Sequence, residues 1–144
     1  MKQRIGCVSV LVKDYDEAIA YYTRVLGFRL VQDDAIAEGK RWVLVAPMGG
    51  SECGLLLAKA KNEAERNAIG HQAGGRVFLF LQTDDFWRDY RVFAERGVNF
   101  AESPREEAYG TVAVFEDLYG NRWDLLEMKP LPSQSPQPIR QTAD

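Results

Sequence analysis

The stretch that decides the fold of this chain begins with Asp14-Tyr15-Asp16-Glu17-Ala18 and ends with Leu26-Gly27-Phe28. A second stretch, from Asp84-Asp85-Phe86-Trp87 to Arg96-Gly97-Val98, has the same organisation at an offset of 70 residues (14 to 84, and 27 to 97). Each stretch is typical of a short amphipathic helix, because an acidic residue stands where the helix would begin and a glycine where it would end. The chain therefore contains an internal repeat.

An alternating apolar run precedes each helix, at Cys7 to Val12 and at Val77 to Gln82, and runs typical of strands follow it. The repeat therefore predicts two copies of strand–helix–strand–strand–strand, at residues 4–60 and 76–128. One copy could not bury both faces of a curved sheet, so we expect the two to pair around a shared interior. The predicted fold class is α+β: two tandem βαβββ modules form a curved mixed sheet around a central cavity, where a small molecule would sit.

Other segments connect or follow the two modules. Residues 61–75 are charged and then glycine-rich, and we interpret them as a linker with at most a helical turn. Residues 129–144 are rich in proline, which predicts a disordered tail or an extended arm lying on a neighbour. The expected strands and second helix fall at Ile5–Lys13, Phe28–Asp33, Arg41–Pro47, Cys53–Ala60, Arg76–Thr83, Asp85–Arg96 (the helix), Val98–Glu102, Thr111–Glu116 and Arg122–Met128.

The composition excludes several classes of function. With 46% apolar and 27% charged residues, the 144-residue chain is typical of one compact globular protein. Its formal net charge of −3 argues against a nucleic-acid partner, since phosphate binding needs a basic surface. No apolar stretch has the length of a membrane span, and no signal-peptide core follows the first residues. Cys7 and Cys53 lack paired spacing, which favours reduced thiols and a cytoplasmic location.

Two segments resemble the vicinal oxygen chelate superfamily, also called the glyoxalase/bleomycin-resistance/dioxygenase group. One is the opening from Asp14 to Phe28, and the other is Phe115-Glu116-Asp117-Leu118-Tyr119-Gly120-Asn121-Arg122-Trp123-Asp124. The second is similar to the Asp-Pro-x-Gly-Asn turn of the family, with Leu118 in place of proline. The resemblance covers residues 4–128. It implies the fold predicted above and a homodimer, in which strands of both chains often build the cavities.

The resemblance also implies where a metal would be bound. Enzymes of the family hold a divalent metal in the cavity, with ligands on the first and last strands of each module. The corresponding positions here are Cys7, Gly54, Phe78 (or Val77 in a register slipped by one) and Asp124. Only Cys7 and Asp124 keep a possible ligand atom, and the single histidine, His71, lies in the linker. Two histidines and a carboxylate cannot come from one chain, although a zinc site of Cys7, Asp124 and His71 is conceivable. We predict no bound metal and no cofactor.

The strand phases predict which side chains face the cavity. They are Cys7, Ser9, Leu11, Phe78, Phe80, Gln82, Arg122, Asp124 and Leu126. The resemblance adds Trp42 and Tyr109 at the cavity mouth. For each group a structural interpretation stays open: the phenylalanines could simply fill space, Asp124 and Arg122 could neutralise each other, and the two mouth aromatics could lie at a subunit contact. Cys7 would act as a nucleophile only with a base beside it. The charged run from Lys59 to Arg66 is interpreted as a solvated face.

Two hypotheses of different classes follow. The first is a glyoxalase/bleomycin-resistance-like protein that binds a small organic ligand, a drug or a metabolite, in the inter-module cavity without a metal. The second is a metal-dependent lyase or dioxygenase of the same superfamily with non-standard ligands, either Asp124 with Cys7 or groups from a second chain. The presence of only one histidine in the sequence distinguishes the two hypotheses and favours binding without a metal. A third interpretation is an interaction module whose cavity is filled by its own side chains. Whether the chain is an enzyme stays open.

Overall fold

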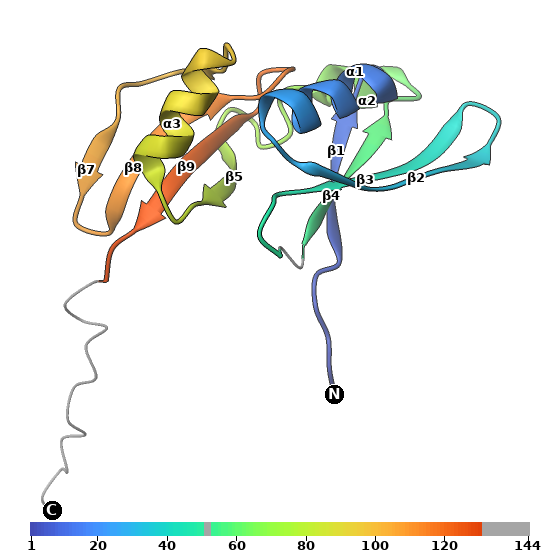
Figure 1. The fold of residues 1–144 in the computed structure, drawn as a ribbon. Helices are drawn as coiled ribbons and strands as arrows, with labels where there is room; N and C mark the ends of the chain where they lie inside the picture. The colour runs from blue at the N-terminus through green and yellow to red at the C-terminus, as the bar shows by residue number, and fades with distance from the viewer. Residues whose placement is uncertain (51–52, 131–144) are drawn as a thin grey trace, which may run out of the picture.

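The computed structural model describes residues 1–50 and 53–130, which form two βαβββ modules beside each other (Figure 1). The first module consists of β1 (Cys7–Val12), α1 (Tyr15–Ala20), the π-helical turn η1 (Tyr21–Val25), β2 (Arg29–Ala37), β3 (Lys40–Ala46) and β4 (Gly54–Lys59). The second consists of β5 (Val77–Gln82), α3 (Phe86–Glu95), β6 (Asn99–Phe100), β7 (Arg105–Glu107), β8 (Gly110–Glu116) and β9 (Arg122–Met128). Between them lies the short helix α2 (Glu63–Ala68).

Each module carries a mixed sheet, which confirms the predicted fold class. In the described residues the first sheet has the strand order β1-β4-β3-β2 and the second the order β5-β9-β8-β6, with β7 also paired to β8. The first and last strands of each module run parallel, and the other pairs run antiparallel. Figure 1 shows the β2–β3 hairpin reaching away from β1 and β4.

The helices begin and end where the sequence indicates. The carboxylate of Asp14 accepts a hydrogen bond from the amide of Glu17 at 2.8 Å, and the carboxylate of Asp85 accepts one from the amide of Arg88 at 3.1 Å. Both therefore satisfy amides that a helix N-terminus leaves without an internal partner. After each helix the chain turns at a glycine with positive φ, 75° at Gly27, a conformation that costs a residue with a side chain more than it costs glycine.

Aromatic side chains of both modules pack together where the modules meet. Trp123 and Leu125 point into this core as predicted, with exposures of 3% and 0%. The indole of Trp123 lies 6.2 Å from the ring of Tyr22 and 6.1 Å from that of Phe28, measured between ring centroids. The shared interior is therefore filled by side chains, and a ligand site within one chain must lie outside it. The buried core aromatics are Tyr15, Tyr22, Phe28, Phe86, Phe93, Phe115 and Trp123.

A buried carboxylate fixes the turn between β8 and β9. Within the described residues, Asp117 accepts hydrogen bonds from the side chains of Tyr22, Asn121 and Trp123, and from the amides of Tyr119, Gly120 and Asn121, at 2.8–3.2 Å. Asp117 is 6% exposed, so these donors replace the water that its charge has lost. Tyr22 comes from the first module, and the carboxylate thus joins the two modules.

The segment between the modules is held in place rather than loosely connected. The side-chain amide of Gln72 accepts a hydrogen bond from the amide of Leu11 and donates one to the carbonyl of Ser9 at 3.0 Å. Gln72 thereby occupies the outer edge of β1, where a neighbouring strand would otherwise pair. The backbone amide of Gln72 donates a hydrogen bond to the side-chain oxygen of Asn121, in the second module, at 3.2 Å.

Some features differ from the sequence expectations. The linker contains α2, β2 extends to Ala37 rather than ending at Asp33, and the short strand β7 lies in a region that carries no strand pattern. The expected proline-rich tail falls mostly in residues 131–144, outside the described residues. No helix within residues 1–50 and 53–130 combines the length and the apolar character needed to cross a membrane.

Candidate ligand-binding site

The second sheet presents one face that the core does not cover. Register places Phe80 beside Asp124, Gln82 beside Leu126, and Val114 on the other side of Asp124. Side chains alternate between the two faces of a strand, so these residues lie opposite the core residues Trp123 and Leu125. We call it the second-module face: Phe80, Gln82, Val112, Val114, Asp124 and Leu126, of which Val112 and Leu126 are buried, at 0% and 7% exposure. Phe80 is 60% exposed, an unusual setting for a phenyl ring.

Asp124 is the chemically distinctive residue of the second-module face. Its Oδ1 atom is buried and has no hydrogen-bond partner in the part of the chain that the structure describes. Burial raises the pKa of this carboxyl group above 3.8; the Glu102 carboxylate also raises it, and the Arg105 guanidinium opposes the rise. Arg105 itself is engaged by Glu102 at 3.0 Å and by Glu107 at 2.6 Å. Asp124 as a residue is only half-buried, so a ligand can reach its carboxylate and satisfy Oδ1 once the carboxylate group rotates.

Asp124 and Arg122 do not form the ion pair considered above. They lie two residues apart on β9, but within the described residues Arg122 makes no contact with the Asp124 carboxylate. Arg122 instead lines a hollow of about 300 Å³ beside the linker, together with Phe78 and His71. Phe78 sits at a shift in register between Val77 and Leu79 and packs partly against the core, so it does not continue the face of Phe80.

The other predicted residues are dispersed. Gln82 also lines a cleft of about 550 Å³ between the modules, and Trp42 lines a hollow of about 640 Å³ beside the β2–β3 hairpin. Cys7, Ser9 and Tyr109 line none of these three hollows. A single chain therefore does not bring the predicted residues into one cavity.

Among the described residues, no histidine lines a hollow together with Cys7. This cysteine is half-buried on β1 opposite Gly54, whereas His71 lies at the linker hollow, which Cys7 does not line. The thiol of Cys7 therefore lacks the partner that a nucleophilic cysteine needs. Tyr109 is 37% exposed beside β8, and its carbonyl accepts a hydrogen bond from the amide of Lys129 at 2.8 Å.

The side chains present do not fit a divalent metal. No group of at least three histidine, cysteine, aspartate or glutamate side chains placed to hold a metal occurs within residues 1–50 and 53–130. The first-module position on β4 is Gly54, where a Cβ atom would lie 3.0 Å from the Leu44 side chain and 3.0 Å from the Val45 carbonyl. A ligating side chain there would collide with its neighbours. Asp124 remains as a lone carboxylate, which is too few donors for a stable site.

Comparison with known proteins decides the family. A sequence profile of the Glyoxalase/Bleomycin resistance protein/Dioxygenase superfamily matches residues 4–125. The chain belongs to this superfamily. A relative within it, an uncharacterized protein of Shewanella frigidimarina, is 55% identical over 129 residues, which cover 89% of this chain and 96% of the relative.

Solved structures share the superfamily fold. UcmS2 superposes with a TM-score of 0.77 at 31% identity, covering 88% of this chain and 99% of UcmS2. TnmS3, an antibiotic binding protein from Streptomyces sp. CB03234, superposes with a TM-score of 0.72 at 29% identity, covering 89% of this chain and 98% of TnmS3. One solved protein of this architecture, TnmS3, is therefore an antibiotic binding protein.

Sequence reasoning missed part of the hollow beside the hairpin. Besides Trp42, this hollow is lined by Lys40, Lys59 and Lys61. The run from Lys59 to Arg66 is interpreted above as a solvated face, because a local charge pattern does not reveal which segment lies opposite. The signal that the sequence carries is the apolar strand β4, which ends at Lys59, two residues before Lys61.

Proposed function

We propose that this protein binds a small organic molecule, a drug or a metabolite, without a bound metal. The observation that carries the proposal is the pairing of Phe80 with Asp124 on the second-module face. An exposed phenyl ring provides apolar contact area for a planar ligand. Beside it, the half-buried Asp124 carboxylate, one oxygen of which has no hydrogen-bond partner among the described residues, provides an orienting polar contact.

The energetics of Asp124 support this assignment. A buried polar atom without a partner costs a protein about 1–3 kcal/mol, and proteins rarely retain one without a reason. A ligand that donates a hydrogen bond to Oδ1 would recover part of that free energy on binding.

We further propose that the binding protein is a homodimer. In one chain, Trp42 of the first module and Phe80 of the second lie on separate open surfaces, and every residue of β2 is exposed. A second copy that set its first-module sheet against the second-module face would enclose both aromatics in one cavity. The family resemblance supports this arrangement, because members often build cavities from strands of both chains. In the single chain the expected residues lie at separate hollows, which fits a site that is completed on assembly.

Two further features support metal-independent binding in the cytoplasm. The donor set around Asp124 does not fit a metal, and TnmS3 is an antibiotic binding protein of the same fold. Cys7 and Cys53 form no disulfide within the described residues, which fits a reducing compartment. The alternative, a metal-dependent lyase or dioxygenase, would require ligands from a second chain next to Asp124.

A thermal-shift screen tests this proposal. The full chain is heated with and without each member of a panel of aromatic antibiotics and aromatic metabolites, in buffer containing EDTA. We expect at least one compound to raise the melting temperature of the wild type, and the rise to be lost in Phe80→Ala but kept in Trp87→Ala, which removes an exposed aromatic ring far from the face. No stabilising compound in the panel, or stabilisation only when EDTA is omitted, would contradict it.

A further inference from the structure

We propose that the hollow beside the β2–β3 hairpin binds a planar aromatic group that carries a negative charge. This inference rests on the proposed small-molecule binding and names the chemical class of the ligand. We call the site the hairpin hollow: Tyr15, Ile36, Glu38, Gly39, Lys40, Arg41, Trp42, Leu56, Leu57, Ala58, Lys59, Ala60, Lys61 and Glu65.

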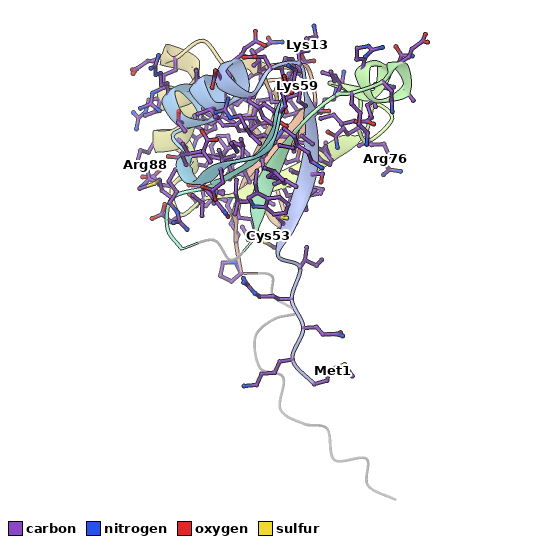
Figure 2. All side chains as sticks on the ribbon, turned by 90° about the vertical axis from the view of Figure 1, so that its right-hand side faces the viewer. Met1, Lys13, Cys53, Lys59, Arg76 and Arg88 are labelled. Carbon is purple, nitrogen blue, oxygen red and sulfur yellow. The ribbon has the colours of Figure 1, made fainter. Side chains whose placement is uncertain are left out.

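The hairpin hollow is a break in the first sheet. On one side, β3 pairs with β4 only over Val43 to Val45. On its other side, β3 stays paired with β2 down to Lys40, its first residue. Beyond Val43 the hairpin therefore leaves β4, as Figure 1 shows, and the hollow lies between the two. Lys59 and Cys53 mark opposite ends of the β4 segment in Figure 2, and the hollow lies at the Lys59 end. Its volume of about 640 Å³ suits a drug-sized molecule.

The walls of the hairpin hollow are apolar and include an accessible indole. Trp42 is 38% exposed and Ile36 is 53% exposed, and Leu56 and Ala58 complete the apolar lining. An indole gives a flat, polarisable surface on which an aromatic ring stacks, and such ring pairs contribute about 0.5–1.5 kcal/mol beyond the area they bury. The lining therefore favours a planar aromatic partner.

The charges at the hairpin hollow select the sign of the ligand. Lys40, Lys59 and Lys61 line it, and none of them has a carboxylate partner in the described part of the chain. Two carboxylates, Glu38 and Glu65, also line it. Three ammonium groups thus outnumber two carboxylates, in a chain whose overall charge is −3.

The fourth cation that lines the hairpin hollow, Arg41, is already paired with carboxylates. Of the two lining carboxylates, Glu65 accepts a hydrogen bond from the neutral side-chain amide of Asn62 at 2.8 Å. Arg41 is bound by both carboxylate oxygens of Asp33, at 3.0 and 2.7 Å, and by Asp16 at 2.9 Å. The lysines are therefore the cations that remain for an incoming anion, and a charge-assisted hydrogen bond to such a group is about twice as strong as a neutral one.

Arg41 also holds the hairpin hollow open. Its guanidinium lies 5.2 Å from the centroid of the Tyr15 ring, and its backbone amide donates to the Tyr15 hydroxyl at 3.3 Å. Tyr15 is the first residue of α1, so these contacts brace the hairpin against the helix. A braced wall loses little conformational freedom on binding, which favours affinity.

The test uses two fluorescent probes and the full chain. The anionic probe is 8-anilinonaphthalene-1-sulfonate, and the neutral probe is N-phenyl-1-naphthylamine, which has the same ring system without the sulfonate. Both are titrated into the wild type, into Lys40→Gln/Lys59→Gln/Lys61→Gln, and into Lys2→Gln/Arg24→Gln/Arg91→Gln, which removes the same charge from exposed cations outside the hollow. Quenching of the Trp42 fluorescence is measured in a Trp87→Phe background, because Trp87 is the other exposed indole of the described residues.

We expect the anionic probe to quench Trp42, and the lysine triple variant to weaken its binding by about tenfold, as loss of charge-assisted contacts predicts. The control triple variant should bind it as the wild type does, and the neutral probe should bind more weakly than the anionic probe. Circular dichroism confirms that each variant is folded.

Three results would overturn the inference. Equal binding of the anionic probe by the wild type and the lysine variant would show that charge does not select the ligand, while leaving small-molecule binding intact. Loss of probe binding in Phe80→Ala but not in Trp42→Ala would place the site on the second-module face and likewise leave the proposed function standing. Failure of the wild type to bind the anionic probe would refute the hairpin hollow, and the thermal-shift screen then decides the proposed function independently.

Discussion

The hydroxyl group of Tyr22 donates a hydrogen bond of 2.8 Å to the carboxylate of Asp117, a residue 95 positions further along the chain. Tyr22 belongs to η1 of the first module, and Asp117 begins the turn between β8 and β9 of the second. Burial, followed by the charge of Asp117, raises the pKa of Tyr22 well above 10.0, so the hydroxyl keeps its proton and remains a donor. This contact holds the two modules in a fixed relation, and the positions of both open surfaces depend on it.

Asp117→Asn should be strongly destabilising. The substitution removes the negative charge that the surrounding donors satisfy. It also turns one acceptor oxygen into an NH₂ donor, so this group would face the N–H and O–H donors that now bind the carboxylate. We expect a loss of about 2–4 kcal/mol in the free energy of unfolding, measured by urea denaturation. Tyr22→Phe removes a single donor and should lose about 1 kcal/mol. A change below about 0.5 kcal/mol for Asp117→Asn, the range of ordinary surface substitutions, would contradict this role.

Gly70→Ala should loosen the linker from the second module. A Cβ atom at Gly70 would lie 1.9 Å from the Tyr119 carbonyl oxygen, and the backbone there has a φ of +74°. Gly74 is a matched control, since its φ is +65° and a Cβ atom would meet nothing within 4 Å. Gly74→Ala should lose about 1–2 kcal/mol of stability for the left-handed backbone alone, and Gly70→Ala should lose distinctly more in the same urea titration. Equal losses would show that the close approach to Tyr119 is unimportant.

The stability of Asp124→Asn should depend on pH relative to the wild type. The raised pKa means that the folded state keeps a proton that the unfolded state releases, in a window that begins at 3.8 and ends at the raised value. Wild-type stability therefore falls as pH rises through this window and stays lowered above it. Asparagine cannot ionise, so the variant should have the higher urea midpoint at pH 7, and the difference should shrink near pH 3. The same difference at both pH values would contradict a raised pKa.

Light scattering should give twice the mass of one chain at micromolar concentration. The proposed dimer covers the second-module face, so Phe80→Arg should shift the equilibrium toward monomer by placing a charge at the contact. Trp87→Arg changes another exposed aromatic, on α3, with 49% exposure against 60% for Phe80, and should leave the mass unchanged. A monomer mass for the wild type would refute the proposed assembly.

Much of the fold could be predicted because it depends on local patterns. The alternation on β9 places Trp123 and Leu125 in the core, and Asp14 caps a helix in the way its position suggests. β7 could not be predicted, because Arg105-Glu106-Glu107 is short and fully polar and becomes a strand only by pairing with β8. Phe78 was misplaced on the open face, since the irregularity between Val77 and Leu79 breaks the alternation on which that assignment depends.

The site was harder to predict than the fold because it depends on contacts between distant segments. In the sequence, Lys59 and Lys61 belong to a charged run that is typical of a solvent-exposed face. They lie beside Trp42 only because β3 leaves β4 at this end of the sheet. In the same way, the lack of a hydrogen-bond partner for Oδ1 of Asp124 among the described residues is a property of its surroundings rather than of β9 itself. Patterns of period two identify which face a residue occupies, but they do not show what lies across from it.

The most direct test of metal-independent ligand binding is titration calorimetry with the best compound from the thermal-shift screen. The compound is titrated into protein stripped with EDTA, and into the same protein after reloading with Zn²⁺ or Mn²⁺. We predict the same dissociation constant in each case, and the same stoichiometry per chain. Binding that disappears on stripping and returns with the metal would contradict the account and identify the protein as a metal-dependent member of the superfamily.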